Sequence, residues 1–411
     1  MKSIIILFSL SLSMLANNLT QLIDQAHNNE LVQVYKSKIT SADHSYKASK
    51  SAYLPKISVG ASGSFFSPVD SMGAGQVYNA YAQASLVLLD GFKRENLLDE
   101  QKTIKKSRQY DLSQVKKEIS LQVSSLYFKM QITQADIKSL EQSKKQLQEQ
   151  LKQQQKFFEA KLTTEDNVAR IEAAVANTEY KIEETKYLYD EYTALLQTLT
   201  NQQITTLQVQ QIKEPLEVQA RQMDSLKSLK SQADSIAFKA QQMDSSNYPT
   251  IVLSDKYSFS KYEDDNLNFP GVKRLDTQNV LALSLSMNLF DFGSASKQKQ
   301  AILSEQNALL SQIAYKTKEV NAALELSLRA IDRSKKLLYA SELSQDASVR
   351  TFEIVEKKYK ARVVDYVKYL DALSNKIEAQ AQYNRAQGTL QISYAQYYYN
   401  AGLDIKEYIH D

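Results

Sequence analysis

The sequence predicts a mainly α-helical chain with two short β-hairpins, arranged as two similar halves. Three observations indicate this fold class: the placement of Gly and Pro, a helical spacing of apolar residues over very long stretches, and a two-residue alternation between them. Only 9 Gly and 5 Pro occur among 411 residues. Neither is found between Phe92 and Glu214 or from Ser294 to Gln387. Because both residue types interrupt helices, we expect the helices to be confined to these uninterrupted stretches.

Within the uninterrupted stretches, the apolar residues follow one face of a helix. They recur at intervals of three, four and seven, with Gln, Lys and Glu between them, as coiled-coil-like packing requires. This stripe comprises Leu112, Val115, Ile119, Val123, Leu126, Met130, Ile137, Leu140, Leu147, Leu151, Phe158 and Leu162 in the first half, and Ile302, Leu309, Ile313, Val320, Leu324, Ile331 and Leu338 in the second. A helix from Phe92 to near Ala160 would be roughly 100 Å long at about 1.5 Å per residue, longer than an ordinary globular domain.

An alternation of apolar and polar side chains marks four segments near residues 55–90 and 249–292. The apolar positions are Ile57, Val59, Ala61, Gly63 and Phe65 in the first segment and Tyr78, Ala80, Ala82, Ala84, Leu86 and Leu88 in the second. They are Ile251, Leu253, Tyr257 and Phe259 in the third, where Asp255 interrupts the pattern, and Leu281, Leu283, Leu285, Met287 and Leu289 in the fourth. We therefore expect four strands, each with one apolar and one polar face.

These strands have two possible settings. Strands of about 10 to 14 residues with one apolar face match tilted outer-membrane strands, whose lipid face is apolar and whose inner face is polar. A soluble antiparallel sheet on a helical core is the alternative. Four strands leave two open edges, and lipid cannot satisfy unpaired backbone groups. The membrane interpretation therefore requires oligomerisation.

The two halves also align with each other. Asp90 and Asp291 each follow an apolar strand and are 291 − 90 = 201 residues apart, as are Phe158 and Tyr359. Ala160 with Ala361 and Lys161 with Arg362 share that spacing. We expect each half to contain a helix, a hairpin, a very long helix and a return helix.

The first residues have the composition of an export signal. Lys2 supplies a positive charge, Ile4 to Leu15 form a short apolar run, and Ala16 is a plausible cleavage point. A buried N-terminal helix is the alternative. No later segment approaches 18 uninterrupted apolar residues, so the sequence predicts no transmembrane helix. Removal of residues 1–16 would change the formal net charge from +3 to 49 − 47 = +2.

The composition also argues against several functional classes. The absence of Cys excludes disulfides, thiolate metal sites, cysteine nucleophiles and a lipid-bearing cysteine. Basic and acidic residues are interspersed on helical faces, so nucleic acid is not expected as a partner. The only histidines are His27, His44 and His410, and none belongs to a nucleophile or metal-ligand pattern. We place His27 and His44 on the surface of the first helix and His410 in a frayed tail. No catalytic, cofactor-binding or metal residue and no cofactor is predicted, and the chain is not expected to be an enzyme.

In the order and duplication of its motifs, the sequence resembles the TolC family of outer-membrane efflux proteins over essentially all of the mature chain. Ser51-Ala52-Tyr53-Leu54-Pro55 and Asn247-Tyr248-Pro249 precede the two hairpins. Leu88-Leu89-Asp90-Gly91-Phe92 and Leu289-Phe290-Asp291-Phe292-Gly293 end them. The turn with Tyr359 through Leu370-Asp371-Ala372 completes the likeness.

This resemblance implies a TolC-like trimer. Three protomers would contribute four strands each to a 12-stranded barrel in the lipid of the cell outer membrane, which resolves the problem of open edges. The helices would continue into the periplasm as a long coiled-coil tunnel. Residues 201–218, with the ends of the chain, would form a belt around it, and the outer loops would be Ser67 to Gln76 and Glu263 to Asp276.

The resemblance also implies functional regions at the helical tips. Family members close their duct there and meet a periplasmic adaptor (membrane fusion protein), which joins them to an inner-membrane pump. The candidate contacts are Lys161, Leu162, Thr163, Arg362, Val363 and Val364. Lys161 and Arg362 replace the glycine that is usual at both tips.

Charged and tyrosine residues hold the gate of family members closed. The matching positions are Tyr359 and Asp371, together with Lys368, which occupies a usually acidic position. A ring of Asp371 carboxylates would attract cations, and a neighbouring ring of Lys368 would oppose it. The alternative is that Lys368 and Asp371 are solvated residues on the outside of the return helix.

The resulting division places a signal peptide at 1–16, a first repeat at 17–200, a linker or equatorial belt at 201–218 and a second repeat at 219–411. We expect the hairpins at about 55–90 and 249–292. The expected function is a passive exit channel of a tripartite efflux or type I secretion system, which conducts drugs, small molecules or polypeptides. A secreted coiled-coil structural or surface protein without channel activity is the alternative.

Overall fold

The computed structural model describes residues 17–69, 73–204, 206–215, 220–265 and 274–410. The expected signal peptide at 1–16 lies outside these residues, as do parts of the linker at 201–218 and of both expected outer loops. The chain divides into two compact units, one of residues 1–34, 112–224 and 317–411 and the other of residues 35–111 and 225–316. We describe each unit by itself.

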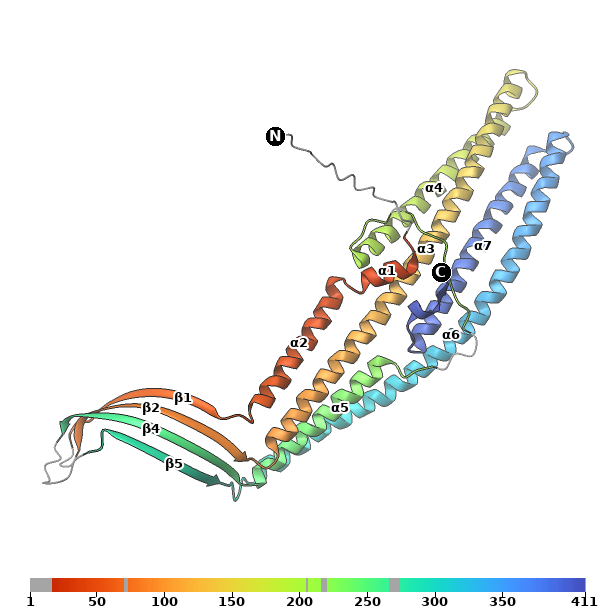
Figure 1. The fold of residues 1–411 in the computed structure, drawn as a ribbon. Helices are drawn as coiled ribbons and strands as arrows, with labels where there is room; N and C mark the ends of the chain where they lie inside the picture. The colour runs from red at the N-terminus through yellow and green to blue at the C-terminus, as the bar shows by residue number, and fades with distance from the viewer. Residues whose placement is uncertain (1–16, 70–72, 205, 216–219, 266–273, 411) are drawn as a thin grey trace, which may run out of the picture. The chain divides into compact units, whose positions relative to one another are not determined.

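The described residues confirm the predicted fold class, which is mainly helical with one four-stranded antiparallel sheet (Figure 1). The helices are α1 (Leu19–Ala26), α2 (Glu30–Ser51), α3 (Lys93–Glu159), α4 (Glu165–Thr200), α5 (Asp224–Gln242), α6 (Ser294–Lys360) and α7 (Tyr366–Asn400). The sheet contains β1 (Lys56–Phe65), β2 (Ala74–Leu89), β4 (Thr250–Asp265) and β5 (Thr277–Ser286). Two short 3-10 helices, η1 (Met243–Asn247) and η2 (Ile405–Tyr408), and a two-stranded sheet of β3 (Gln211–Ile212) and β6 (Ile409–His410) complete the order.

The internal repeat is visible in the helix bounds. Helices α3 and α6 each contain 67 residues, and their first residues are 294 − 93 = 201 positions apart. Helices α4 and α7, with 36 and 35 residues, begin at positions that differ by the same 366 − 165 = 201. Both long helices run through the two compact units.

Two of the four strands are longer than the expected 10 to 14 residues. The outer strands β1 and β5 have 10 residues each, whereas the central strands β2 and β4 have 16. The apolar alternation predicted a strand reaching Leu289, but β5 ends at Ser286. Beyond that residue the chain turns through Phe292 and Gly293, both at positive φ, into α6.

Aspartates cap both long helices where the strands end. The Asp90 carboxylate accepts hydrogen bonds from the backbone N–H and the Nε of Arg94, at 3.2 and 2.7 Å. The Asp291 carboxylate accepts from the backbone N–H groups of Gly293 and Ala295, at 2.9 and 2.8 Å. Each aspartate thus satisfies N–H groups that the first turn of a helix leaves without partners.

The structure corrects the expectations for His27 and His410. The first helical segment is two helices, and His27 is half-buried at the end of α1, where its Nε2 lies 3.1 Å from the Lys116 carbonyl and 2.9 Å from the Ser120 hydroxyl. His410 lies in the two-residue strand β6 (Ile409–His410), which pairs with β3 (Gln211–Ile212). These residues were expected at the surface and in a frayed tail, because single-sequence patterns do not register the long-range partners.

Candidate functional site

The register of the four-stranded sheet separates its side chains into two faces. The order is β1-β2-β4-β5 with every pair antiparallel, and the strands lie side by side in one curved layer (Figure 1). Val59 is opposite Ala82, which is opposite Tyr257, and Leu86, Leu253 and Leu283 form another such row. Successive residues of a strand point to opposite faces. One face is therefore apolar and the other carries mainly Ser, Asn, Gln and Gly.

The apolar face is exposed in the single chain. On the edge strand β1 the exposed fractions of Ile57 and Val59 are 77% and 80%, and on the edge strand β5 those of Leu281, Leu283 and Leu285 are 72%, 68% and 68%. Water is a poor solvent for so large a contiguous apolar surface. Asp255, which interrupts the alternation, lies on this face opposite Ala84 and Leu281.

Both edges of the sheet are also open. Strand β1 pairs with β2 alone and β5 pairs with β4 alone among the described strands, so each edge presents a row of backbone groups. Soluble proteins commonly blunt such edges with charged or Pro residues. Here the edge strands carry Lys56 at one end of β1 and no charged residue in β5.

The second candidate region comprises the two helical tips, where α3 turns into α4 and α6 turns into α7. At the first tip the N–H of Leu162 donates to the Phe157 carbonyl at 2.8 Å and the N–H of Lys161 to the Phe158 carbonyl at 2.9 Å. The second tip repeats this pattern at 2.8 and 2.9 Å, from Val363 to Lys358 and from Arg362 to Tyr359. These paired bonds form a Schellman motif, which ends a helix with a residue in the left-handed conformation.

Lys161 and Arg362 occupy those left-handed positions, with φ of 55° and 59°. Glycine is favoured there because it has no Cβ to clash. A side chain at either position therefore has a backbone cost that glycine would avoid. The adjoining residues Leu162 and Val363 are 67% and 69% exposed, whereas Thr163 and Val364 are half-buried.

The two tips differ in how the following helix begins. The Asp365 carboxylate accepts the backbone N–H of Lys368 at 2.9 Å and caps α7. Thr164 holds the equivalent position before α4 without a side-chain capping bond. The hydroxyls of Thr163 and Thr164 instead accept hydrogen bonds from the Asn167 amide, at 3.2 and 3.1 Å.

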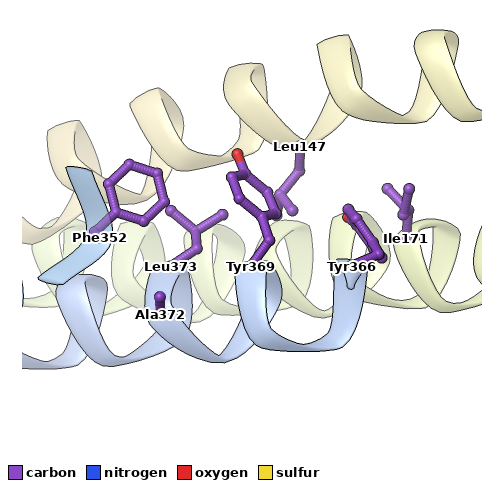
Figure 2. Close-up of a cluster of buried hydrophobic side chains, with 7 residues drawn as sticks. All are labelled: Leu147, Ile171, Phe352, Tyr366, Tyr369, Ala372 and Leu373. Atoms are coloured by element: carbon purple, nitrogen blue, oxygen red, sulfur yellow. The ribbon is translucent and has the colours of Figure 1, made fainter. Parts of the chain in front are cut away.

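Next to the second tip, aromatic side chains form a buried cluster. Figure 2 shows Tyr366, Tyr369, Ala372 and Leu373 of α7 pointing into a shared core with residues from three other helices. The buried members are Leu147, Ile171, Phe352, Tyr366, Tyr369, Ala372 and Leu373, and Tyr359 packs against them. The Tyr359 ring stacks on that of Tyr369 with centroids 4.9 Å apart and lies 5.6 Å from that of Tyr366.

The tyrosine hydroxyls of this cluster differ in their partners. The Tyr359 hydroxyl accepts a hydrogen bond of 2.6 Å from the Gln154 amide of α3. The buried Tyr366 hydroxyl has no hydrogen-bond partner among the described residues. Burial raises its pKa, and the neighbouring Tyr369 and Tyr359 add to that effect. Burial also raises the pKa of Tyr369, while the nearby Gln146 side chain partly offsets the shift. The cluster therefore holds neutral phenols.

Lys368 and Asp371 do not join this cluster. Both side chains are exposed in the single chain, and neither forms an ion pair within its described part. Asp371 lines a groove of about 620 Å³ between α3, α4 and α7, together with Lys181, Glu378 and Arg385. The groove also contains Asp136, whose pKa is raised by burial although it accepts a 3.0 Å hydrogen bond from the Asn384 amide.

The structure thus brings Tyr359 together with Tyr366, Tyr369 and Gln154, which the sequence interpretation did not select. Tyr366 and Tyr369 are three residues apart on α7, and Leu373 follows four residues later, so a helical-face count starting at the tip would have found them. Gln154 gave no such signal, because nothing in its own surroundings distinguishes it from the many other glutamines of α3. Across the described residues, no group of three or more His, Cys, Asp or Glu side chains could hold a metal ion.

Comparison with known proteins shows a similarity to one family. Residues 22–202 match the family model described as outer membrane efflux protein. This matched segment, somewhat less than half of the chain, is similar to the outer membrane efflux protein family. No curated protein sequence matches it significantly.

Solved structures share the fold of this efflux protein over nearly its whole length. CusC is 14% identical, with 95% of this chain and 93% of CusC covered and a TM-score of 0.82. The CmeC outer membrane channel of Campylobacter jejuni is 16% identical, with coverage of 93% and 85% and a TM-score of 0.82. The outer membrane protein VceC of Vibrio cholerae is 12% identical, with coverage of 94% and 96% and a TM-score of 0.80. The similarity therefore extends the fold assignment beyond the residues that the family model matches.

The family match and the shared fold together indicate an outer-membrane efflux channel of the TolC type. The family is one of channels and not of enzymes. None of the described helices combines the length and the apolar character that crossing a membrane requires.

Proposed function

We propose that three copies of this efflux protein form one passive exit duct, the outer-membrane component of a tripartite efflux system. The observation that carries the proposal is the sheet, which has one exposed apolar face and two open edges. Three sheets joined β5 to β1 would pair every edge and form a barrel of three times four strands, twelve in all. The apolar face would contact lipid and the polar face would line the lumen.

The helices would form the periplasmic part of the duct. On this assignment residues 1–16 are the export signal, 17–200 and 219–411 are the two repeats, and 201–218 with the chain ends form the belt. The contacts between the linker and the ends support the belt: Asn17 N–H donates to the Thr206 carbonyl at 2.9 Å and Lys213 N–H to the Tyr408 carbonyl.

The tips would receive the periplasmic adaptor, which links the duct to an inner-membrane pump. Leu162 and Val363 support this role, because they are apolar and exposed at turns fixed by hydrogen bonds. Their flanking residues Lys161 and Arg362 are cationic, so the tips would favour an adaptor surface with apolar pockets and acidic rims.

We place the periplasmic gate at Tyr359, Lys368 and Asp371. Tyr359 packs in the aromatic cluster that joins α6 and α7, while Lys368 and Asp371 are exposed where a trimer would bring copies of α7 close to the threefold axis. Opening would require a small shift of the packed helices. Lys368 would reduce the cation preference of an Asp371 ring.

Planar-bilayer recording tests the duct. The purified mature protein should give discrete conductances and migrate as a heat-sensitive trimer, whereas a water-soluble, non-conducting monomer would refute the proposal. Because the chain contains no Cys, one cysteine introduced in β1 and one in β5 report directly on edge pairing. Cross-linking should produce dimers and trimers, and a pair placed in β2 and β4 should cross-link only within one chain.

The gate has its own test. Tyr359→Phe combined with Asp371→Ala removes the hydrogen bond to Gln154 and the carboxylate ring, so resting conductance should rise. Glu172→Ala is a control, because this exposed carboxylate occupies the equivalent return helix α4, near the first tip instead of the second. An unchanged current in the double variant would contradict the gate and mean that both residues have no role in closing the duct.

A further inference from the structure

The polar face of the sheet carries a single charge in its middle. Lys256 of β4 lies opposite Gln83 of β2 and Val280 of β5, and Gln83 lies opposite Ser58. The other charged residues in the same alternation of the described strands are Lys56 and Asp264, at opposite ends of the sheet. Asp255 and Lys256 are adjacent, so their side chains point to opposite faces. No carboxylate of this face therefore neutralises Lys256 at its own level.

A tyrosine ring holds the Lys256 ammonium at this place. The Nζ atom of Lys256 lies 4.4 Å from the centroid of the Tyr81 ring. Tyr81 also lies on the polar face, opposite Gly60 and Ser258. A cation over an aromatic face is attracted by its quadrupole, but the ring carries no charge that could cancel that of the ammonium.

Gly60 makes room for this ring. A Cβ atom at position 60 would lie 2.7 Å from both the Cζ and the hydroxyl oxygen of Tyr81, which is closer than any normal contact. The tyrosine therefore lies across the glycine backbone and forms a platform for Lys256. Glycine in a strand often marks such a close approach.

We propose that Lys256 and Tyr81 form an anion-binding ring in the barrel lumen. This inference rests on the trimeric duct proposed above, which would place three such pairs around one axis. The ligand class is small anions with phosphate or carboxylate groups, including the anionic groups of transported solutes. An ammonium has three N–H donors, and the Tyr81 ring faces only one side of it. The donors directed away from the ring are free to bind an anion in passage.

The electrostatics of a polar lumen favour this role. Three uncompensated positive charges at one level raise the local concentration of anions and repel cations. The effect depends on salt, because the Debye length is about 10 Å at 0.1 M and about 3 Å at 1 M. It would act independently of the Asp371 and Lys368 rings of the proposed gate.

Reversal potentials measured across a KCl gradient test the ring. Lys256→Gln should shift the selectivity of open channels towards potassium, and Lys256→Glu should shift it about twice as far, because the charge changes by two units instead of one. Lys261→Gln is the matched control. Lys261 lies on the opposite face and forms an ion pair of 2.7 Å with Glu263, so its loss should leave the selectivity unchanged.

Inorganic phosphate provides a direct probe of binding. At low salt, phosphate added from the barrel side should reduce the current of the unmodified channel, and Lys256→Gln should lose this inhibition. Tyr81→Leu keeps the charge and removes the platform, so it should weaken the inhibition, whereas Tyr81→Phe should retain it. If Lys256→Gln does not assemble, the two Tyr81 variants decide the question.

The outcomes separate this inference from the exit duct. Conducting trimers whose selectivity and phosphate inhibition are unaffected by Lys256→Gln and Lys256→Glu would overturn the ring and leave the duct intact. If the unmodified protein forms no conducting trimer, both proposals fail. If Lys256→Gln and Lys261→Gln shift the ion selectivity equally, the ring is also overturned. The effect would then come from the total charge of the protein and not from the position of Lys256.

Discussion

Glycine at the two helical tips should make both turns more stable, in contrast to the effect of glycine inside a helix. Lys161 and Arg362 have left-handed backbones, with φ of 55° and 59°. This conformation costs a residue with a Cβ about 1–2 kcal/mol. The greater freedom of glycine in the unfolded chain takes back about 0.4–1 kcal/mol. The net gain for Lys161→Gly or Arg362→Gly is therefore about 0.5–1 kcal/mol, or roughly a 2- to 5-fold change in the local opening equilibrium.

Hydrogen exchange followed by mass spectrometry measures this equilibrium at the tips. The reporting amides are those of Leu162 and Val363, which donate the hydrogen bonds that span five residues in the two Schellman motifs. Their protection should rise by the stated factor in the glycine variants. Lys161→Ala removes the charge and keeps the Cβ, so it should bring no gain.

Lys360→Gly is the control for backbone position. Lys360 is the last residue of α6 and has a helical backbone, so glycine there should lower protection by the equivalent of about 1 kcal/mol. Equal effects of Lys161→Gly and Lys161→Ala, or a fall in protection for both glycine variants at the tips, would refute the argument from backbone strain.

Three further changes test the packing of the helical part. Tyr366→Phe should leave the stability to denaturant unchanged or raise it by up to about 1 kcal/mol, because it removes a buried hydroxyl without a partner; a clear loss would mean that the hydroxyl has a partner in the assembled protein. Burial lowers the pKa of His27 below its ordinary 6.5, against the opposing effects of the Lys116 carbonyl and Asp404. Since the unfolded chain then binds the proton more readily, stability should fall as the pH drops below about 6.5, and His27→Gln should flatten that dependence in thermal unfolding. Gly388→Ala should destabilise, because the added Cβ would lie 2.4 Å from two side-chain atoms of Ile132; Ile132→Ala in the same chain should recover part of the loss, and additive effects in the double-mutant cycle would contradict the predicted clash.

The sequence predicted the parts of the fold that depend on local periodicity. The long helices and the existence of four amphipathic strands followed from residue spacing, and both expected ends of the first long helix were within one residue of α3. The pairing of β2 with β4, which joins the two hairpins into one sheet, could not be read from either half alone. The end of β5 was misplaced because Met287 and Leu289 continue the alternation, although the chain leaves the sheet after Ser286.

The candidate site was less predictable because its members come from different helices. Tyr359 was found through its motif, but its hydrogen bond to Gln154 spans 205 residues of sequence, and no local pattern encodes such a contact. Lys161 and Arg362 were recognised as departures from glycine. Their left-handed backbone shows the physical reason why glycine suits those positions.

The two repeats have the same backbone design but different cores beside their tips. Subtracting 201 from Tyr366 and Tyr369 gives Glu165 and Val168 in α4, and the counterpart of Phe352 is Leu151. The tyrosines of this cluster thus come from the second repeat, as does the Asp365 cap. In a trimer, tips of two kinds would alternate around the axis. One supplies the aromatic residues of the shared core and has a capped helix, and the other supplies Leu147 and Ile171 to that core and has no side-chain cap. A duct that opens when one kind of helix pair moves against the other needs such a difference. If the two pairs were equivalent, neither would move in preference to the other. The divergence of the repeats at these few positions is therefore the feature that best supports a gate beside Tyr359.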